Sequence, residues 1–174
     1  MEQIVYEGES YRRVNSKWVD SSNLVACESI QKILNRRYLE TLDVSSYSIE
    51  ELVAEGDRLK ESTSYQAAIT FYEKAAESCD EQTLAYILPR ITACYRKCNM
   101  ARSAIDLFSF AKSRYGSAMM SHALLTSAAA AYCDLKEYEN ALRCCRRAYK
   151  HLNGQYNSNL SAVWGRIKKE SGLE

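Results

Sequence analysis

Cysteines are the residues of this sequence whose type and spacing most readily suggest chemistry. Cys144 and Cys145 are adjacent and stand among three arginines, where positive charge would favour the reactive thiolate. Cys94 and Cys98 are four residues apart, so a helix would place both thiols on one face. A tetrahedral metal site needs four ligands, however, and no further ligands recur at a matching spacing. The sequence therefore predicts no metal site and no bound cofactor.

Catalytic motifs of other kinds are also missing from the sequence. The two histidines, His122 and His151, have no carboxylate or cysteine at a repeating ligand spacing. No glycine-rich phosphate loop is present, and no serine, histidine and aspartate set can be recognised. We therefore expect no catalytic activity, and a small enzyme is the least favoured of the function classes considered.

The composition favours a helical protein in a reducing compartment. The 174 residues include only six glycines and one proline, and 47% are hydrophobic against 26% charged. Few chain breakers suit helices better than a sandwich or barrel. Seven cysteines with no CxxC pair indicate free thiols. Without an apolar run long enough for a signal peptide or a membrane span, the sequence predicts a cytoplasmic protein.

A long internal period organises the chain. Ala68, Ala104 and Ala141 are separated by 36 and 37 residues. Each belongs to a ladder of four small or apolar residues, and the three ladders are Leu59, Ala68, Tyr72 and Ala75; Tyr95, Ala104, Phe108 and Ala111; and Tyr132, Ala141, Cys145 and Ala148. Repeats of this length indicate a stack of helical hairpins.

Each unit of the period reads as two helices joined by a short polar link. Ser48 and Glu51 have capping-box spacing at the start of the first unit, while Gly116 and the pair Asn153-Gly154 tolerate the left-handed backbone that ends helices. The apolar spacing predicts helices over residues 50–63, 65–79, 84–98, 101–115, 118–134, 137–152 and 156–170. Pro89 either kinks the third of these helices or begins it.

The period resembles that of the tetratricopeptide repeat (TPR) family over about residues 48–153. The family pattern W-x2-L-G-x2-Y…A-x3-F falls on three sets of residues: Leu52, Glu55, Gly56, Leu59, Ala68 and Tyr72; Leu88, Ile91, Thr92, Tyr95, Ala104 and Phe108; and Leu125, Ala128, Ala129, Tyr132, Ala141 and Cys145. No unit has the tryptophan or the closing proline, and Glu55 replaces an apolar residue. A related helical-hairpin solenoid is the alternative.

The resemblance implies an all-α, TPR-like solenoid of three repeats. Leu160, Val163, Trp164 and Ile167 repeat the first-helix spacing once more and predict a C-terminal capping helix. The family register assigns Cys145 a bulky core position, so a packing role is favoured over a redox role. Its neighbour Cys144 is expected nearer the surface, with the flanking arginines pointing outward.

The first 47 residues do not fit the period. They predict short strands near 3–7, 10–14 and 17–20, with turns at Gly8 and at Asn15-Ser16. A helix over 27–42 follows, and Ile30, Ile33, Leu34 and Tyr38 share the face that would cover this small sheet. We therefore expect two domains, an N-terminal strand and helix appendage (1–47) and the helical array with its capping helix (48–174).

The resemblance also implies a concave surface lined by the first helices. We expect partner-binding residues Asp57, Lys60, Tyr86, Arg90, Arg96 and Lys97 on it, and further lining residues Thr126, Ala130 and Cys133. The positions of the family's peptide-carboxylate clamp hold Asp57, Ala93 and Ala130, so a chaperone-tail clamp is not expected. Arg90, Arg96 and Lys97 form a basic stripe suited to an acidic segment, although a merely solvated face is equally consistent with the sequence.

The sequence favours a protein-protein interaction module that binds a protein or peptide, acidic in character, through this surface or the N-terminal hairpin. Residues 48–80 carry eight acids and three bases, while 81–115 carry two acids and six bases. That asymmetry would orient a charged partner, or is simply uneven surface charge. The alternative is nucleic-acid binding through the basic residues Arg90, Arg96, Lys97, Arg143, Arg146, Arg147 and Lys150. The sequence assigns no oligomeric state.

Overall fold

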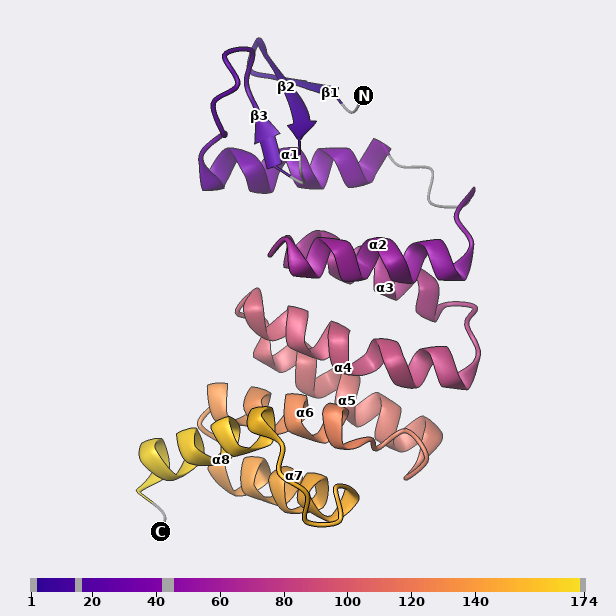
Figure 1. The fold of residues 1–174 in the computed structure, drawn as a ribbon, viewed down its shortest axis with the longest axis vertical. Coiled ribbons are helices and arrows are strands. Elements are labelled where there is room, and N and C mark those ends of the chain that lie inside the picture. The colour runs from indigo at the N-terminus through magenta and orange to yellow at the C-terminus, as the bar shows by residue number, and fades with distance from the viewer. Residues whose placement is uncertain (1–2, 15–16, 42–45, 173–174) are drawn as a thin grey trace. The chain divides into compact units, whose positions relative to one another are not determined.

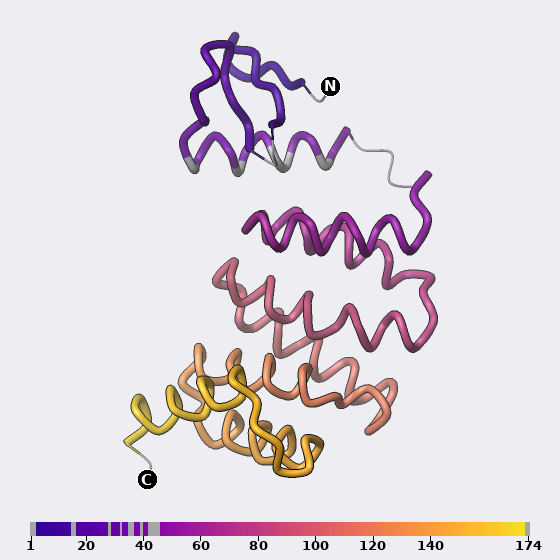
Figure 2. The backbone as a smooth tube through the Cα atoms, viewed as in Figure 1, coloured from indigo at the N-terminus to yellow at the C-terminus, as the bar shows by residue number. Residues whose placement is uncertain are grey.

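The computed structural model describes residues 3–14, 17–41 and 46–172 (Figures 1 and 2). Its contacts divide the chain into two units, Met1–Glu77 and Ser78–Glu174, which are described one at a time. The first unit holds a sheet and three helices, and the second holds five helices. The domain boundary expected after residue 47 stays a prediction.

A three-stranded antiparallel sheet opens the first unit. Its strands are β1 (Gln3–Tyr6), β2 (Glu9–Val14) and β3 (Lys17–Val19), in the order β1-β2-β3. Glu7 and Gly8 join the first two with φ values of 51° and 84°, the left-handed pair that a tight two-residue hairpin requires. The three predicted strands and the Gly8 turn are thus confirmed. The turn expected at Asn15-Ser16 lies outside the described residues.

Helix α1 (Glu28–Thr41) covers one face of this sheet, as the sequence predicted. Tyr11 from β2, Trp18 from β3 and Leu34 from α1 form a buried cluster, with Ile30 and Tyr38 packed around it. The face of α1 that carries these apolar residues is therefore the face that supplies the core of the sheet.

Side chains of α1 also form hydrogen bonds with both edges of the sheet. The amide of Gln31 accepts a hydrogen bond from the Trp18 backbone nitrogen (2.9 Å) and donates one to the Trp18 carbonyl (2.7 Å). On the other edge, Arg37 donates to the Val5 carbonyl (3.4 Å) and lies 4.9 Å from the ring centre of Tyr6. Unpaired edges invite strand addition, and these contacts occupy one position on each edge.

The remaining helices form three hairpins and a closing helix. The first unit contains α2 (Ile49–Glu61) and α3 (Tyr65–Ala76); the second contains α4 (Glu81–Lys97), α5 (Ala101–Tyr115), α6 (His122–Asp134), α7 (Tyr138–His151) and α8 (Ser158–Ser171). Helices α2 and α3, α4 and α5, and α6 and α7 pack in pairs, and α8 packs on α6 and α7 (Figure 1). The predicted helices, including the capping helix, are confirmed with shifts of a few residues at their ends.

The first helix of each hairpin, and α8, begin with the same device. A side-chain oxygen at the N-cap accepts a hydrogen bond from a backbone nitrogen three residues later, in the pairs Ser48–Glu51, Asp80–Thr83, Ser121–Leu124 and Asn157–Leu160. The second helices α3, α5 and α7 have no such side-chain cap. Helix α8 therefore begins in the same way as the first helix of each hairpin.

A three-residue turn links the two helices of every hairpin. Its central residue, Thr63, Asn99 or Lys136, has a φ of 60° or 61°. In each turn the next backbone nitrogen bonds back to a carbonyl five residues earlier, Leu59, Tyr95 or Tyr132, at 2.8–2.9 Å. This is the Schellman ending of a helix, and its recurrence at the period of the sequence fixes each hairpin locally.

Pro89 lies inside α4 rather than at its start. The helix begins after the Asp80 cap and continues through Pro89, which is buried. The reading in which Pro89 begins the helix is therefore wrong. The Ser127 hydroxyl of α6 donates to the Pro89 carbonyl (3.4 Å), so this turn of α4 is tied to the neighbouring hairpin.

Candidate partner-binding surface

One face of α4 is the strongest candidate contact surface in the second unit. Tyr86, Arg90, Ala93 and Lys97 are spaced four, three and four residues apart, so they follow one line along the helix. The side chains that α4 buries, including Leu84, Ile87 and Ile91, lie on its other faces, which pack on α5 and α6. We call Tyr86, Arg90, Ala93 and Lys97 the α4 stripe.

The end of the α4 stripe that carries Tyr86 is ordered by a stacked pair. The guanidinium carbon of Arg90 lies 3.3 Å from the centre of the Tyr86 ring, and its Nη1 donates to the Tyr86 carbonyl (2.9 Å). Tyr86 is nevertheless 43% exposed. An aromatic ring and a cation held in one orientation lose little side-chain entropy on binding, which makes them a good anchor for a partner.

Arg96, the fourth predicted site residue of α4, points away from the stripe toward α6. Its Nε donates to Asp134 at the end of α6 (2.6 Å), and Arg166 of α8 donates to the same carboxylate. Arg166 also bonds Glu170 (2.7 Å). Asp134 ends a helix, where a negative charge is unfavourable, and the two guanidinium groups offset this. Arg96 therefore ties α4, α6 and α8 together.

The ionisation of this network follows from its geometry. Burial raises the pKa of Asp134, but hydrogen bonds from Arg96 and Arg166 lower it by more, so the pKa lies below its usual value. The hydrogen bond from Arg166 likewise lowers the pKa of Glu170. Both groups are thus more acidic in the folded protein, and their pairing holds α8 in place above about pH 4.

We expect Asp134→Asn to weaken the docking of α8. The substitution removes a charge that two arginines share. Because the site is partly exposed, we expect the free energy of α8 docking to fall by only about 1 kcal/mol at neutral pH. Because the folded pKa of Asp134 is lowered, this stabilisation is present above the unfolded value and is lost as pH falls through the folded value. The readout is hydrogen exchange of the α8 amides in both proteins between pH 7 and pH 3.

A matched control for that experiment is Asp106→Asn on α5, since Asp106 is exposed and forms no ion pair with another described residue. We expect no change in α8 exchange there. Equal protection of α8 in Asp134→Asn and in the original protein at pH 7 would show that the network does not hold the helix.

Asp57 and Lys60 belong to the first unit, on α2. The Tyr72 hydroxyl of α3 donates to Asp57 Oδ1 (2.6 Å), so Asp57 helps to close the first hairpin. Lys60 is half-buried near the end of the helix. The six predicted site residues thus divide between the two units, and three of them, Tyr86, Arg90 and Lys97, share one line of side chains on α4.

Three other residues expected on the concave surface are buried. Thr126, Ala130 and Cys133 of α6 are at most 8% exposed, so the prediction that they line an open surface is wrong. Helix α8 packs on α6, and the Cys133 thiol donates to Glu170 of α8 (3.5 Å). The apolar spacing predicted a closing helix, but only packing showed which surface of α6 it covers.

The adjacent thiols of Cys144 and Cys145 lack the exposure and the lowered pKa of a reactive site. Cys145 is fully buried, as expected, but Cys144 is only 6% exposed, and its prediction nearer the surface is wrong. Burial raises the pKa of Cys144 to about 11 and that of Cys145 to about 12, so both stay protonated at neutral pH. Around them Ala128 and Ala141 let α6 and α7 approach closely.

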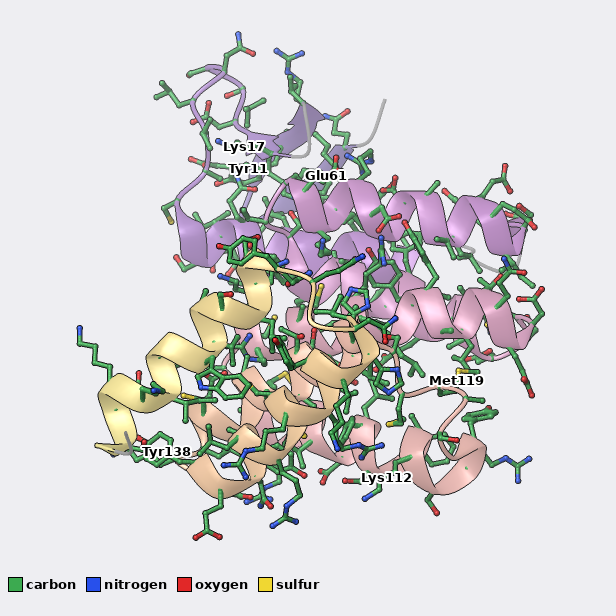
Figure 3. All side chains as sticks on the ribbon, turned by 60° about the horizontal axis from the view of Figure 1, so that its bottom comes forward. Tyr11, Lys17, Glu61, Lys112, Met119 and Tyr138 are labelled. Carbon is green, nitrogen blue, oxygen red and sulfur yellow. The ribbon has the colours of Figure 1, made fainter. Side chains whose placement is uncertain are left out.

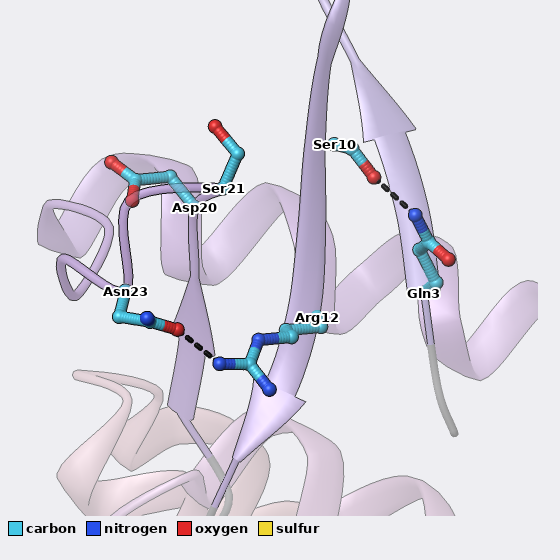
Figure 4. Close-up of a pocket in the computed structure, with 6 residues that line it drawn as sticks. All are labelled: Gln3, Ser10, Arg12, Asp20, Ser21 and Asn23. Atoms are coloured by element: carbon cyan, nitrogen blue, oxygen red, sulfur yellow. Dashed lines mark hydrogen bonds between the residues drawn. The ribbon is translucent and has the colours of Figure 1, made fainter.

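A polar hollow lies on the first unit beside β2 (Figure 4). Its lining residues are Gln3, Ser10, Arg12, Asp20, Ser21 and Asn23. Gln3 bonds Ser10, and Arg12 bonds Asn23, so much of its polar capacity is already used within the unit. In the described part of the chain, no three metal-ligating side chains come together and no helix has the length and apolar character of a membrane span.

Comparisons with known proteins place the fold. No family model and no curated protein matches the sequence. Among solved structures, the Sgt2 TPR domain of Aspergillus fumigatus is similar, with a TM-score of 0.61 and 14% identity over 71% of this chain and 79% of that one. Two others are similar, an APC/C hetero-tetramer of Cut9 and Hcn1 (TM-score 0.60, 18% identity) and the TPR domain of P58(IPK) (0.57, 18%). The fold is that of the tetratricopeptide repeat.

The TPR fold accounts for the order of the helices and for α8. The α4 stripe lies on the first helix of its hairpin. The matches to Cut9–Hcn1 and P58(IPK) each include 84% of this chain, but they include only 28% and 43% of those longer chains. At these identities the likeness shows the fold alone, and TPR folds are in general protein-interaction modules.

Proposed function

We propose that this protein is a cytoplasmic adaptor or scaffold without catalytic activity of its own. Its helical array would hold a segment of a partner protein, with residues 1–47 as an appendage. The TPR fold supports an interaction role. The buried, protonated thiols of Cys144 and Cys145 and the lack of a metal cluster among the described residues give no support to an enzyme.

The proposed contact surface is the α4 stripe. The observation that carries this proposal is the exposed Tyr86 ring with the Arg90 guanidinium stacked on it. Lys97 adds a second cation on the same line, so the stripe suits a segment with carboxylates and an apolar anchor. Asp57 and Lys60 of α2 and Arg96 of α4 remain proposed contacts, although Arg96 and Asp57 already bond within the protein.

The test compares Tyr86→Ala and Lys97→Glu with the original protein in capture of partners from native lysate, followed by mass spectrometry. We expect a specific protein to be retained by the original chain and lost from both variants, because an exposed aromatic anchor contributes at least about 1 kcal/mol to binding. Phe110→Ala is the matched control, since Phe110 is an exposed aromatic side chain (59%) on α5 and is not part of the α4 stripe. Equal loss in the control would refute the proposed surface.

Nucleic acid is the alternative partner, and the same variants distinguish it from a protein partner. Labelled single- and double-stranded oligonucleotides are titrated at low and physiological salt, because phosphate contacts give a steep logarithmic salt dependence. Micromolar binding that persists at physiological salt would overturn the proposal. Lys97→Glu serves here rather than Arg96→Glu, since a carboxylate at residue 96 would face Asp134 and disturb the fold.

A further inference from the structure

Helix α7 carries the strongest separation of buried and charged faces among the helices of the second unit. One face buries Ala141, Cys144, Cys145 and Ala148 against the rest of the unit. The opposite face carries four bases within eight residues, and we call them the α7 basic face: Arg143, Arg146, Arg147 and Lys150. Three of the four are exposed and Arg147 is half-buried.

No member of the α7 basic face forms an ion pair with another described residue. Elsewhere in the described chain, Arg58, Lys74, Arg96, Arg102 and Arg166 each have a carboxylate partner. Arginines that face solvent together without carboxylates repel one another, and this cost is relieved when an anion binds. The α7 basic face therefore concentrates positive charge that forms no ion pair within the described part of the protein.

Positive charge near α7 also comes from α5. Burial raises the pKa of the Cys144 thiol, and the charges of Arg147, Lys112 and Arg143 oppose that shift. Lys112 belongs to α5 and is labelled in Figure 3.

The shape of the α7 basic face indicates what binds it. Arg143, Arg146 or Arg147, and Lys150 follow one line at i, i+3 or i+4, and i+7, over about 10 Å of helix. Glu139 is exposed one turn before Arg143 on the same line, so the positive run ends there. A phosphate backbone that continues along the helix would meet this carboxylate. A short row of carboxylates spaced one helical turn apart matches both the spacing of the four bases and the short length of the basic face.

We propose that the α7 basic face docks an acidic α-helix of a partner protein, with carboxylates at i, i+4 and i+7 paired with these bases. Guanidinium groups bind carboxylates in a two-pronged geometry that suits such a row. The surface is separate from the α4 stripe, so one chain could hold two segments at once and join them. The inference does not depend on what binds α4.

The test is a titration of a labelled, capped alanine-based helix of about 20 residues, carrying glutamates at i, i+4 and i+7, followed by fluorescence anisotropy at low and physiological salt. Arg146→Gln with Lys150→Gln should weaken binding at least about fourfold, since each exposed charge pair contributes a factor of roughly two to five. The control, Lys168→Gln with Lys169→Gln, removes two exposed α8 charges and should change affinity by less than about twofold.

A charge exchange sharpens the test. Arg146→Glu with Lys150→Glu should lose the glutamate helix and gain a helix with lysines at the same positions. Equal binding of a helix with glutamines in those positions would overturn the proposal, as would equal loss in the α8 control or no binding at low salt. Tighter binding of a duplex oligonucleotide than of the peptide would assign the surface to nucleic acid instead. Tyr86→Ala should leave the peptide titration unchanged, which separates this result from the α4 proposal.

Discussion

Trp18→Ala is expected to destabilise the sheet of the first unit by about 3–5 kcal/mol, since truncation of a buried tryptophan leaves a large cavity. Trp18 is fully buried, stacks edge-on against Tyr38 at 5.8 Å and lies in one cluster with Tyr11 and Leu34. A three-stranded sheet has little else to stabilise it. The readout is hydrogen exchange, in which the amides of β2 and β3 should lose protection.

The second tryptophan supplies the matched control. Trp164 of α8 is only half-buried, so Trp164→Ala should cost clearly less and should leave the sheet protected. The amides of α6 and α7 should stay protected in Trp18→Ala, because the second unit has its own core. Loss of protection throughout the chain would contradict this division.

Gly56→Ala is expected to lower the free energy of unfolding by about 1–3 kcal/mol, although alanine normally favours a helix. A Cβ at Gly56 would lie 2.6 Å from Cε1 of Tyr72. That ring cannot move aside easily, because it is buried and its hydroxyl is bonded to Asp57. The change should therefore separate α2 from α3, which denaturant unfolding of the two proteins measures.

Gly165→Ala is the internal control for that result. Gly56 stands eight residues after the N-cap Ser48, and Gly165 stands eight residues after the N-cap Asn157. The two glycines therefore hold equivalent positions in α2 and α8. A Cβ at Gly165 would meet nothing within 4 Å, since no other described element packs there. We expect a gain of about 0.5–1 kcal/mol from helix propensity alone. The same sign of change at both glycines would contradict the packing argument.

The candidate site was only partly predictable. Tyr86, Arg90 and Lys97 share a line that the helical period alone defines, and the structure places them together on α4. Arg96 differs from them because its partner, Asp134, is 38 residues away. Its direction depends on the packing of two helices, which no local pattern encodes. The bases of the α7 basic face can be read from the sequence. Their lack of carboxylate partners cannot, because it depends on how the neighbouring helices are arranged.

The sequence alone determined the hairpins of this protein, because their signals are local. Helix caps such as Ser48, turn residues such as Asn99 and the spacing of Ala68, Ala104 and Ala141 act over a few residues or repeat at a fixed period. Each fixes where a helix begins, ends or presents its small face. The order of helices and the capping helix therefore followed from residue types.

Tertiary structure decided which side chains are available to a partner. Cys144 and Thr126 are buried because neighbouring helices cover them, and Asp57 bonds Tyr72 because α3 folds back on α2. These outcomes depend on distances between helices, which the packing of many side chains sets together. A periodic sequence specifies the face of each helix, but the burial of a residue on the border between two faces is decided only when the helices meet.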